Sequence, residues 1–203
     1  MKLYYATGTI SIAVAIALEE AGLAYDTHKL DFAAGEQQSD AYARVNPKGR
    51  VPALEVDGTI LTETGALLDF IATRAPHLMP TDAVDAARAR SVMYYLASTM
   101  HVNHAHKMRG HRWADNESSW QDMTAKVPET MTASARFVEE ECLAGPFILG
   151  EMFTLADAYL YMVCTWLPAD NVDLEPFPKV RAFMRAMEAR DSVKAVRAKG
   201  MLR

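Results

Sequence analysis

Two kinds of hydrophobic pattern divide the chain near residue 80. Before that point, short apolar runs bounded by turn residues predict strands, at residues 2–6, at 24–32 and, as a hairpin turning at Asp57-Gly58, at 51–62. Apolar residues at helical spacing predict helices at 12–22 and 63–75. This order predicts a βαβ unit with parallel strands, followed by an antiparallel hairpin and a helix.

Beyond the stretch "HLMPTDA" the apolar positions follow helical spacing throughout. They predict helices at about 83–108, 118–143, 155–167 and 178–189, with a short helix near Ser192. We therefore predict a mixed α/β domain at residues 1–78, a linker at 79–85 and an all-helical domain at 86–203.

Composition narrows the class of protein. The chain has 203 residues, half of them hydrophobic, which is enough to build a core unaided. A net charge of −5 argues against a nucleic-acid partner, and no apolar run approaches the ~18 residues of a membrane span. The N-terminus lacks the apolar stretch of a signal peptide. Two cysteines that form no CxxC pair predict reduced, buried thiols and a cytoplasmic location.

Four motifs occur in order along the chain: "MKLYYATG" at the start, "VNPKGRVPAL" at 45–54, "TETGAL" at 62–67 and "LGEMFTLADAYLY" at 149–161. Together they resemble the cytosolic glutathione S-transferases, most of all the bacterial beta-class enzymes, over nearly the whole chain. The resemblance implies an α/β thioredoxin-like N-terminal domain, an all-α C-terminal domain, glutathione as co-substrate and a homodimer. In the last motif, Thr154 and Asp157 have the spacing of a structural capping box.

The resemblance implies a glutathione-binding strand at Val51 and Pro52. In thioredoxin-like folds this proline is cis, so that the Val51 N–H and C=O face outward and pair with the cysteinyl unit of glutathione. An ordinary strand-edge proline is the alternative, and it predicts no ligand there.

The "TET" segment supplies the rest of the glutathione site. The amino end of a helix favours a carboxylate, so Thr64 suits the γ-glutamyl carboxylate and Glu63 suits its ammonium group. Arg50 is a candidate for the other carboxylate of the tripeptide. Alternatively, Thr62 and Glu63 only cap the helix.

The chain departs from the beta-class pattern where thiol activation is expected. Those enzymes carry a cysteine where this chain has Ile10, which predicts the absence of thiol redox chemistry. A free thiol is mostly protonated at pH 7, so a transferase has to stabilise the thiolate. Ser11 is our first candidate for the hydroxyl donor, Thr9 the second and Tyr5 the third. A simple N-cap role is the alternative for Ser11.

The segment "LASTMHVNHAHKMRGHRW" is rich in histidine. The spacing that it shares with beta-class enzymes implies that His101 reaches the glutathione sulfur. His104 follows at i+3 on the same helical face, and we assign His104, Met108 and Trp113 to the second-substrate pocket. Further candidates for this pocket are Met100, Arg109 and Arg112. A zinc site and a polar filling of an interdomain groove are alternatives. We predict no metal, since no cysteine or carboxylate stands nearby at a familiar ligand spacing.

Two classes of function follow. The first is an enzyme that stabilises the glutathione thiolate and transfers it to a small hydrophobic electrophile. The second is a non-catalytic carrier of glutathione or of a hydrophobic ligand, and a glutathione-dependent isomerase or dehalogenase lies between them. Ile10 favours the carrier, whereas His101 and Ser11 favour the enzyme.

Overall fold

A four-stranded sheet forms the first part of the molecule. The structure, a computed structural model, describes residues 1–202. The strand order is β2-β1-β3-β4, with β1 and β2 parallel and the other pairs antiparallel. The strands are β1 (Lys2–Tyr5), β2 (Asp26–Lys29), β3 (Ala53–Val56) and β4 (Thr59–Thr62). The predicted βαβ unit and hairpin are confirmed, although the second strand is shorter than predicted.

The hairpin turn is formed by Asp57 and Gly58, which have φ angles of 50° and 81°. Both values are positive, as the tight turn between twisted strands requires. Asp–Gly is a pair that adopts this geometry readily, and the predicted turn is confirmed.

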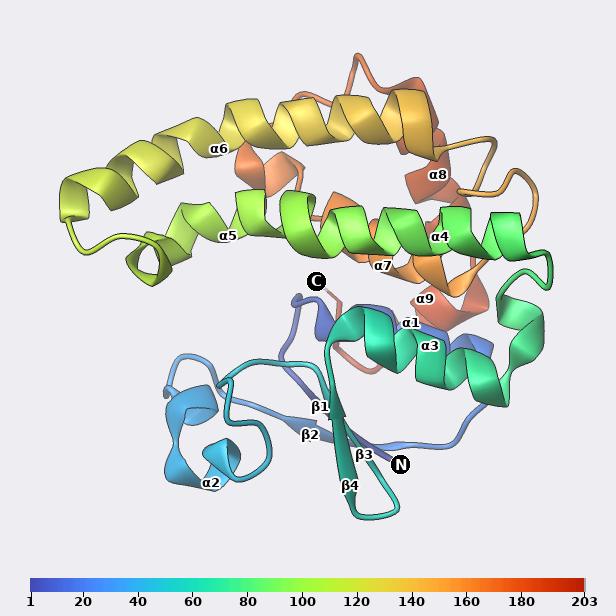
Figure 1. Cartoon of the computed structure of the whole chain (residues 1–203), viewed down its shortest axis with the longest axis horizontal. Coiled ribbons are helices and arrows are strands. Elements are labelled where there is room, and N and C mark those ends of the chain that lie inside the picture. Colours follow the sequence, from blue (N-terminus) through green and yellow to red (C-terminus); the bar gives the residue numbers. More distant parts are fainter. Residues whose placement is uncertain (203) are drawn as a thin grey trace.

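Two helices lie between the sheet and the helical part of the chain (Figure 1). They are α1 (Ser11–Glu20) and α3 (Thr64–Arg74). Eight consecutive residues of α1, from Ser11 to Leu18, are buried, because the helix is covered on one side by the sheet and on the other by helices. This explains why α1 is apolar all round and has no polar stripe. The short helix α2 (Asp40–Ala43) packs Tyr42 on the other side of the sheet, against Tyr4 and Leu30.

The rest of the chain is helical, as predicted. Its helices are α4 (Ala83–Tyr95), α5 (His101–Arg109), α6 (Glu117–Phe137), α7 (Leu155–Cys164), α8 (Pro178–Glu188) and α9 (Asp191–Ala198). The single helix predicted at 83–108 is two helices joined by a π turn at Leu96–Met100. The Asp82 carboxylate accepts hydrogen bonds from the amides of Val84 and Asp85, so α4 starts inside the stretch predicted as a linker.

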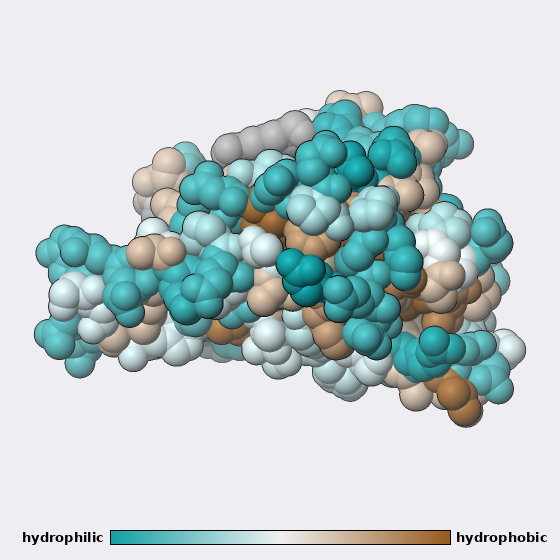
Figure 2. Space-filling model, turned by 90° about the horizontal axis from the view of Figure 1, so that it is seen from above, coloured by the Kyte–Doolittle hydropathy of each residue, from teal (hydrophilic) through white to brown (hydrophobic). Residues whose placement is uncertain are grey.

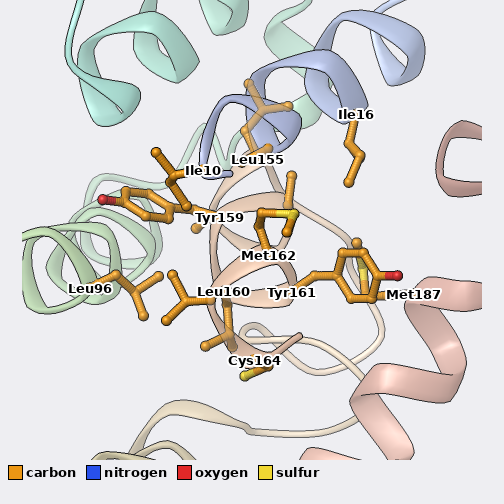
Figure 3. Packing of buried hydrophobic residues seen from close by; sticks show 14 of the residues in the cluster. Ile10, Ile16, Leu96, Leu155, Tyr159, Leu160, Tyr161, Met162, Cys164 and Met187 are labelled. Atoms are coloured by element: carbon orange, nitrogen blue, oxygen red, sulfur yellow. The ribbon is translucent and has the colours of Figure 1, made fainter. Parts of the chain in front are cut away.

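Helix α7 is the centre of the core. All of its residues are buried, and its side chains reach toward Ile10 and Ile16 of the sheet domain and toward Leu96 and Met187 of the helical domain (Figure 3). The predicted capping box is confirmed: Asp157 accepts from the amide and hydroxyl of Thr154, and also from the amide of Ile148. Asp157 therefore has a structural role.

Polar contacts fix the two parts of the molecule relative to each other. The Arg190 guanidinium binds the Glu20 carboxylate at the end of α1 through Nε and Nη2, at 2.5 and 2.7 Å. Near the start of α1, the Trp166 indole N–H donates to the Gly8 carbonyl at 3.0 Å, and the Gly8 amide donates to the Met201 carbonyl. Both ends of α1 are thus held by the helical domain.

The face of the molecule seen from above is mostly hydrophilic, with small apolar areas between polar side chains (Figure 2). Within residues 1–202, no helix combines the length and the apolar character needed to cross a membrane.

Candidate functional site

A cleft of about 700 Å³ lies between the sheet domain and the helical domain. This volume is typical of small-molecule sites. One side, which we call the sheet wall, consists of the loop before α1, the loop before β3 and the start of α3. The other, the helix wall, is formed mainly by α5 and the turn that follows it, with His101, His104, Arg109, Arg112 and Trp113.

The loop before β3 presents a free backbone segment to the cleft. The Val51–Pro52 bond is cis, as predicted, and Val51 lines the cleft. Within residues 1–202 its N–H and C=O have no hydrogen-bond partner. The buried Asn46 side chain and the Tyr42 hydroxyl both donate to the Arg50 carbonyl, at 2.7 and 2.8 Å, and so fix the approach of the loop. The sequence analysis did not identify Asn46, because its role depends on the shape of the folded loop.

The amino end of α3 opens onto the same cleft. Glu63 has a φ of 72°, a conformation that is uncommon for a residue with a side chain and typical of functional sites. No side chain caps this helix, so the capping alternative for Thr62 and Glu63 is wrong. The amides of Thr64, Gly65 and Ala66 have no partner in the described part of the chain. Lys48 binds Glu63 and, at 2.7 Å, the Thr62 hydroxyl.

The loop before α1 places Thr9, but not Ser11, in the cleft. Ser11 is fully buried and does not line the cleft. Ile10 precedes the helix, and Ser11 is its first residue, so Ser11 is not the N-cap either. Ser11 Oγ accepts from the Ala6 amide at 3.3 Å and lies 2.6 Å from Thr9 Oγ1. Tyr5, the third candidate, is buried in the core.

The hydroxyls of Thr9 and Ser11 belong to one hydrogen-bond network. Thr9 Oγ1 donates to the Ala6 carbonyl at 2.8 Å, and the Ser11 hydroxyl then has two acceptors within reach, Thr9 Oγ1 at 2.6 Å and the Ala6 carbonyl at 3.4 Å. A ligand at Thr9 can attract the Thr9 hydrogen without leaving the Ala6 carbonyl unpaired, because the Thr9 amide also donates to it. Because Thr9 lines the cleft and Ser11 is buried beside it, the structure favours Thr9 over Ser11 as a donor to a ligand.

His101 lines the cleft as a neutral imidazole. Its ring lies 5.0 Å from the Trp166 ring. Burial, followed by the nearby His104 and the arginines of the cleft, lowers the pKa of His101 to about 3. At neutral pH it therefore offers one N–H donor and no charge.

His104 is held by a buried carboxylate. Its Nδ1 lies 2.6 Å from Asp170 Oδ2, and its ring stacks on Trp166 at 4.3 Å. Lys107 also binds Asp170, at 3.3 Å. With Nδ1 facing the carboxylate, Nε2 is the free ring nitrogen. The sequence analysis missed Asp170 and Trp166, which lie more than sixty positions from their partners and in no motif.

Of the other residues predicted in the second-substrate pocket, Trp113 lines the cleft and Met108 does not. The Trp113 ring and the His106 ring form a T-shaped pair with their centroids 4.6 Å apart. Met108 is 84% exposed, because the last turn of α5 presents Arg109 to the cleft instead. Assigning Met108 to the pocket was wrong. Within residues 1–202, no group of three or more histidine, cysteine or acidic side chains could hold a metal ion.

The fold and the cleft define a two-domain protein in which a thioredoxin-like domain and a helical domain share one ligand site. Known proteins identify the family. A model of the glutathione S-transferase N-terminal domain matches residues 1–73, and a model of the C-terminal domain matches residues 121–186. Glutathione S-transferase GstA of Escherichia coli is 31% identical over 99% of this chain and 100% of its own. The chain belongs to the glutathione S-transferase family.

Other relatives extend the comparison. A maleylacetoacetate isomerase of Pseudomonas aeruginosa is 30% identical over 89% of this chain and 88% of its own. A glutathione transferase homologue from Sulfitobacter, solved with bound glutathione, superposes with a TM-score of 0.98 at 60% identity, covering 99% of this chain and 98% of that one. The beta-class enzyme of Sphingomonas chungbukensis superposes with a TM-score of 0.84 at 30% identity, over 99% and 100% of the two chains.

Proposed function

We propose that this chain is an enzyme that binds glutathione in the cleft, holds its sulfur as the thiolate and transfers it to a small electrophile. The observation that carries the proposal is that one cleft contains both the unpaired Val51 backbone and the unpaired first amides of α3. An extended tripeptide with a carboxylate at one end matches both groups. In the transfer, a sulfur–carbon bond forms and the leaving group departs with the electrons of its own bond to that carbon.

Each part of glutathione has a counterpart on the sheet wall. The cysteinyl unit pairs with the N–H and C=O of Val51. The γ-glutamyl carboxylate faces Thr64 and the α3 amides, and the ammonium faces Glu63, where it shares the carboxylate with Lys48. The glycyl carboxylate faces Arg50, a cleft residue that makes no ion pair within residues 1–202.

Thr9 is the donor that we assign to the sulfur. Its hydroxyl hydrogen turns from the Ala6 carbonyl toward the thiolate while Ser11 donates to Thr9 Oγ1. A hydroxyl donor stabilises the anion more than the neutral thiol and so lowers its pKa. The neutral His101 imidazole adds an N–H from the helix wall, and the cleft arginines add a favourable positive potential.

Calorimetry with glutathione tests the binding site. Thr64→Val removes a hydroxyl and Glu63→Gln removes a charge, and we expect each variant to bind roughly tenfold more weakly, since a hydrogen bond to a charged group contributes ~1.5–3 kcal/mol and solvent reduces this. Thr59→Val, at the exposed start of β4, is the matched control. Unchanged affinity in both site variants would contradict the assignment.

Turnover separates the enzyme from the carrier. Conjugation of glutathione to chlorodinitrobenzene, a neutral aromatic electrophile, gives a product that absorbs light. An enzyme accelerates this reaction above the rate in buffer, and the acceleration depends on Thr64. A protein that retains glutathione but leaves the rate unchanged with a panel of neutral and charged electrophiles is a carrier.

We also propose a cytoplasmic homodimer. The family relationship supports a dimer, and Tyr94 and Phe137 are large apolar side chains exposed on the helical domain. Cys142 and Cys164 are free and buried, as expected in a reducing compartment. Light scattering during size-exclusion chromatography measures the mass, and a mass of one chain would contradict the dimer.

A further inference from the structure

The helix wall carries positive charge that no acidic group within residues 1–202 pairs with. Arg109, the last residue of α5, and Arg112, in the turn after it, both line the cleft, and Arg50 lines it from the sheet wall. Within residues 1–202 none of the three guanidinium groups makes an ion pair or a side-chain hydrogen bond. Among the described residues that line the cleft, the two carboxylates already have cationic partners: Glu63 binds Lys48, and Asp69 binds Arg90 at 3.0 Å.

The three arginines are close enough to repel one another. Burial, and after it Arg50, lowers the pKa of Arg109. Burial, followed by Arg109 and Arg50, lowers the pKa of Arg112. Like charges placed together without counterions cost free energy, which an anion bound between them removes.

The segment that carries these arginines is firmly held. A Cβ at Gly110 would lie 3.0 Å from the Trp120 Cα and Cβ atoms, so only glycine allows the turn to pack this closely on α6. The Trp120 indole donates to the Ala114 carbonyl at 2.5 Å, and the Thr124 hydroxyl donates to the Lys107 carbonyl at 3.0 Å. The guanidinium groups are therefore presented from a fixed backbone.

The helix dipole explains part of this accumulation of positive charge. Cations in the last turn interact well with the helix dipole, and Arg109 is in that turn. Arg112 lies beyond the helix, and the dipole does not explain why both side chains border the cleft. In the binding mode proposed above, Arg50 binds the glycyl carboxylate of glutathione. Bound glutathione therefore leaves Arg109 and Arg112 without an anionic partner.

We propose that Arg109 and Arg112 bind a carboxylate of the second substrate, so that the electrophile of this enzyme is an anion rather than a neutral hydrophobic molecule. The inference rests on the proposed function, because it names the substrate class of the same cleft. A guanidinium group matches a planar carboxylate with two parallel hydrogen bonds. Trp113, beside Arg112, offers an aromatic face to the apolar body of the substrate.

The first test is binding at equilibrium, without chemistry. Meta-nitrobenzoate and meta-nitrobenzamide differ in charge but hardly in shape, and neither has a leaving group. We expect calorimetry on the protein saturated with S-methylglutathione to show about tenfold tighter binding of the benzoate. Arg109→Gln and Arg112→Gln should each lose most of this preference. Arg109→Lys, which keeps the charge but not the planar fork, should lose part of it.

Arg185→Gln is the matched control, since Arg185 is exposed on α8 and does not line the cleft. Circular dichroism checks that every variant is folded. Equal affinity of the wild-type protein for benzoate and benzamide overturns the proposal. So does a loss of S-methylglutathione binding in the Arg109 and Arg112 variants, because the two arginines would then serve the glutathione carboxylate.

The second test is turnover of a reactive pair, para-chloro-meta-nitrobenzoate and its amide. In both, the thiolate forms the sulfur–carbon bond and chloride leaves with the bonding pair. For each compound we divide the rate with the enzyme by the rate in buffer, which gives an acceleration. We expect the acceleration to be about tenfold larger for the benzoate than for the amide, and the two accelerations to be nearly equal in Arg112→Gln. Equal acceleration of both compounds, without a binding preference, leaves the transferase function standing and overturns the anion site. No acceleration of these two compounds or of any electrophile in the panel described above, with arginine-dependent binding of nitrobenzoate, overturns the transferase function and supports the anion site.

Discussion

The two walls of the cleft recognise ligands by different means. On the sheet wall, the groups available to a ligand are mainly backbone amides and carbonyls, at Val51 and at the start of α3. The charged side chains there are Glu63, which is already paired with Lys48, and Arg50. On the helix wall, the groups are side chains on one helix and the turn after it. Their charges, on Arg109 and Arg112, are unpaired within residues 1–202.

This difference suits the two walls to two kinds of ligand, one that is always the same and one that can vary. Backbone groups keep their positions when side chains change, so the sheet wall suits one invariable ligand, glutathione. Side chains on α5 can be exchanged without altering the fold, so the helix wall can set the choice of electrophile. Variants that change one wall at a time therefore test this difference.

The largest effect is expected at Thr9, on the sheet wall. Thr9→Ala removes the hydroxyl that we assign to the thiolate, and we expect the pKa of bound glutathione to rise by about one to two units, the equivalent of ~1.5–3 kcal/mol. The ultraviolet absorbance of the thiolate, titrated against pH in the complex, measures this directly. Conjugation at pH 7 should fall tenfold or more, while glutathione affinity changes little.

Thr9→Ser and Ser11→Ala are the controls for this prediction. The serine at position 9 keeps the donor and should keep a low thiol pKa. Ser11→Ala removes only the support for Thr9 Oγ1 and should give a smaller rise. If Ser11→Ala raises the thiol pKa and Thr9→Ala does not, our original order of candidates was right.

A smaller effect is expected from His101, on the helix wall, and it concerns stability. The folded protein holds this imidazole neutral with a pKa of about 3, whereas in the unfolded chain its pKa is near 6.5. Between these values the unfolded state binds the additional proton, so stability is complete above pH 6.5 and declines as the pH falls. At pH 5 the loss is roughly 1–2 kcal/mol, from about 1.4 kcal/mol per pH unit.

Urea unfolding of the wild-type protein and His101→Gln at pH 5 and pH 7.5 measures this loss. Gln cannot titrate, so the variant should lose less stability than the wild type between the two pH values. His77→Gln, at an exposed histidine, should behave like the wild type. Equal pH dependence in the wild type and His101→Gln would show that His101 titrates normally in the folded protein.

The last prediction concerns Ile10, where we expect no reaction with oxidised glutathione. Ile10 lines the cleft at the position where the resemblance to beta-class enzymes implies a cysteine, so oxidised glutathione should add no mass to the wild-type protein at pH 7.5. Burial, with Glu141 adding to it, raises the pKa of Cys142 to about 11, and burial also raises the pKa of Cys164, so neither is a reactive thiolate. Ile10→Cys should gain one glutathione by mass spectrometry. A variant without an adduct would place the bound sulfur away from the start of α1.

Much of the sheet wall could be predicted from the sequence, because its motifs are local. Pro52, Glu63 and Thr64 lie within one short stretch, and the chemistry of each follows from a turn, a strand or a helix start. The order of Thr9 and Ser11 could not be predicted, since it depends on which hydroxyl the loop turns inward. The resemblance supplied His101, but Asp170 and Trp166 reach His104 only through the packing of distant helices. The sequence placed Arg109 and Met108 together among the pocket candidates, and only the final orientation of α5 decides that Arg109 faces the cleft and Met108 does not.

The position of Gly8 has a consequence for how the enzyme is made. The loop that carries Thr9 is held by the Trp166 indole and by the Met201 carbonyl, so partners 158 and 193 positions later in the chain complete it. During synthesis, the sheet domain emerges from the ribosome long before either partner exists. This loop therefore acquires its final contacts only when translation has passed residue 201. In the proposed mechanism, a growing chain that can already form the strand at Val51 cannot yet activate a thiol.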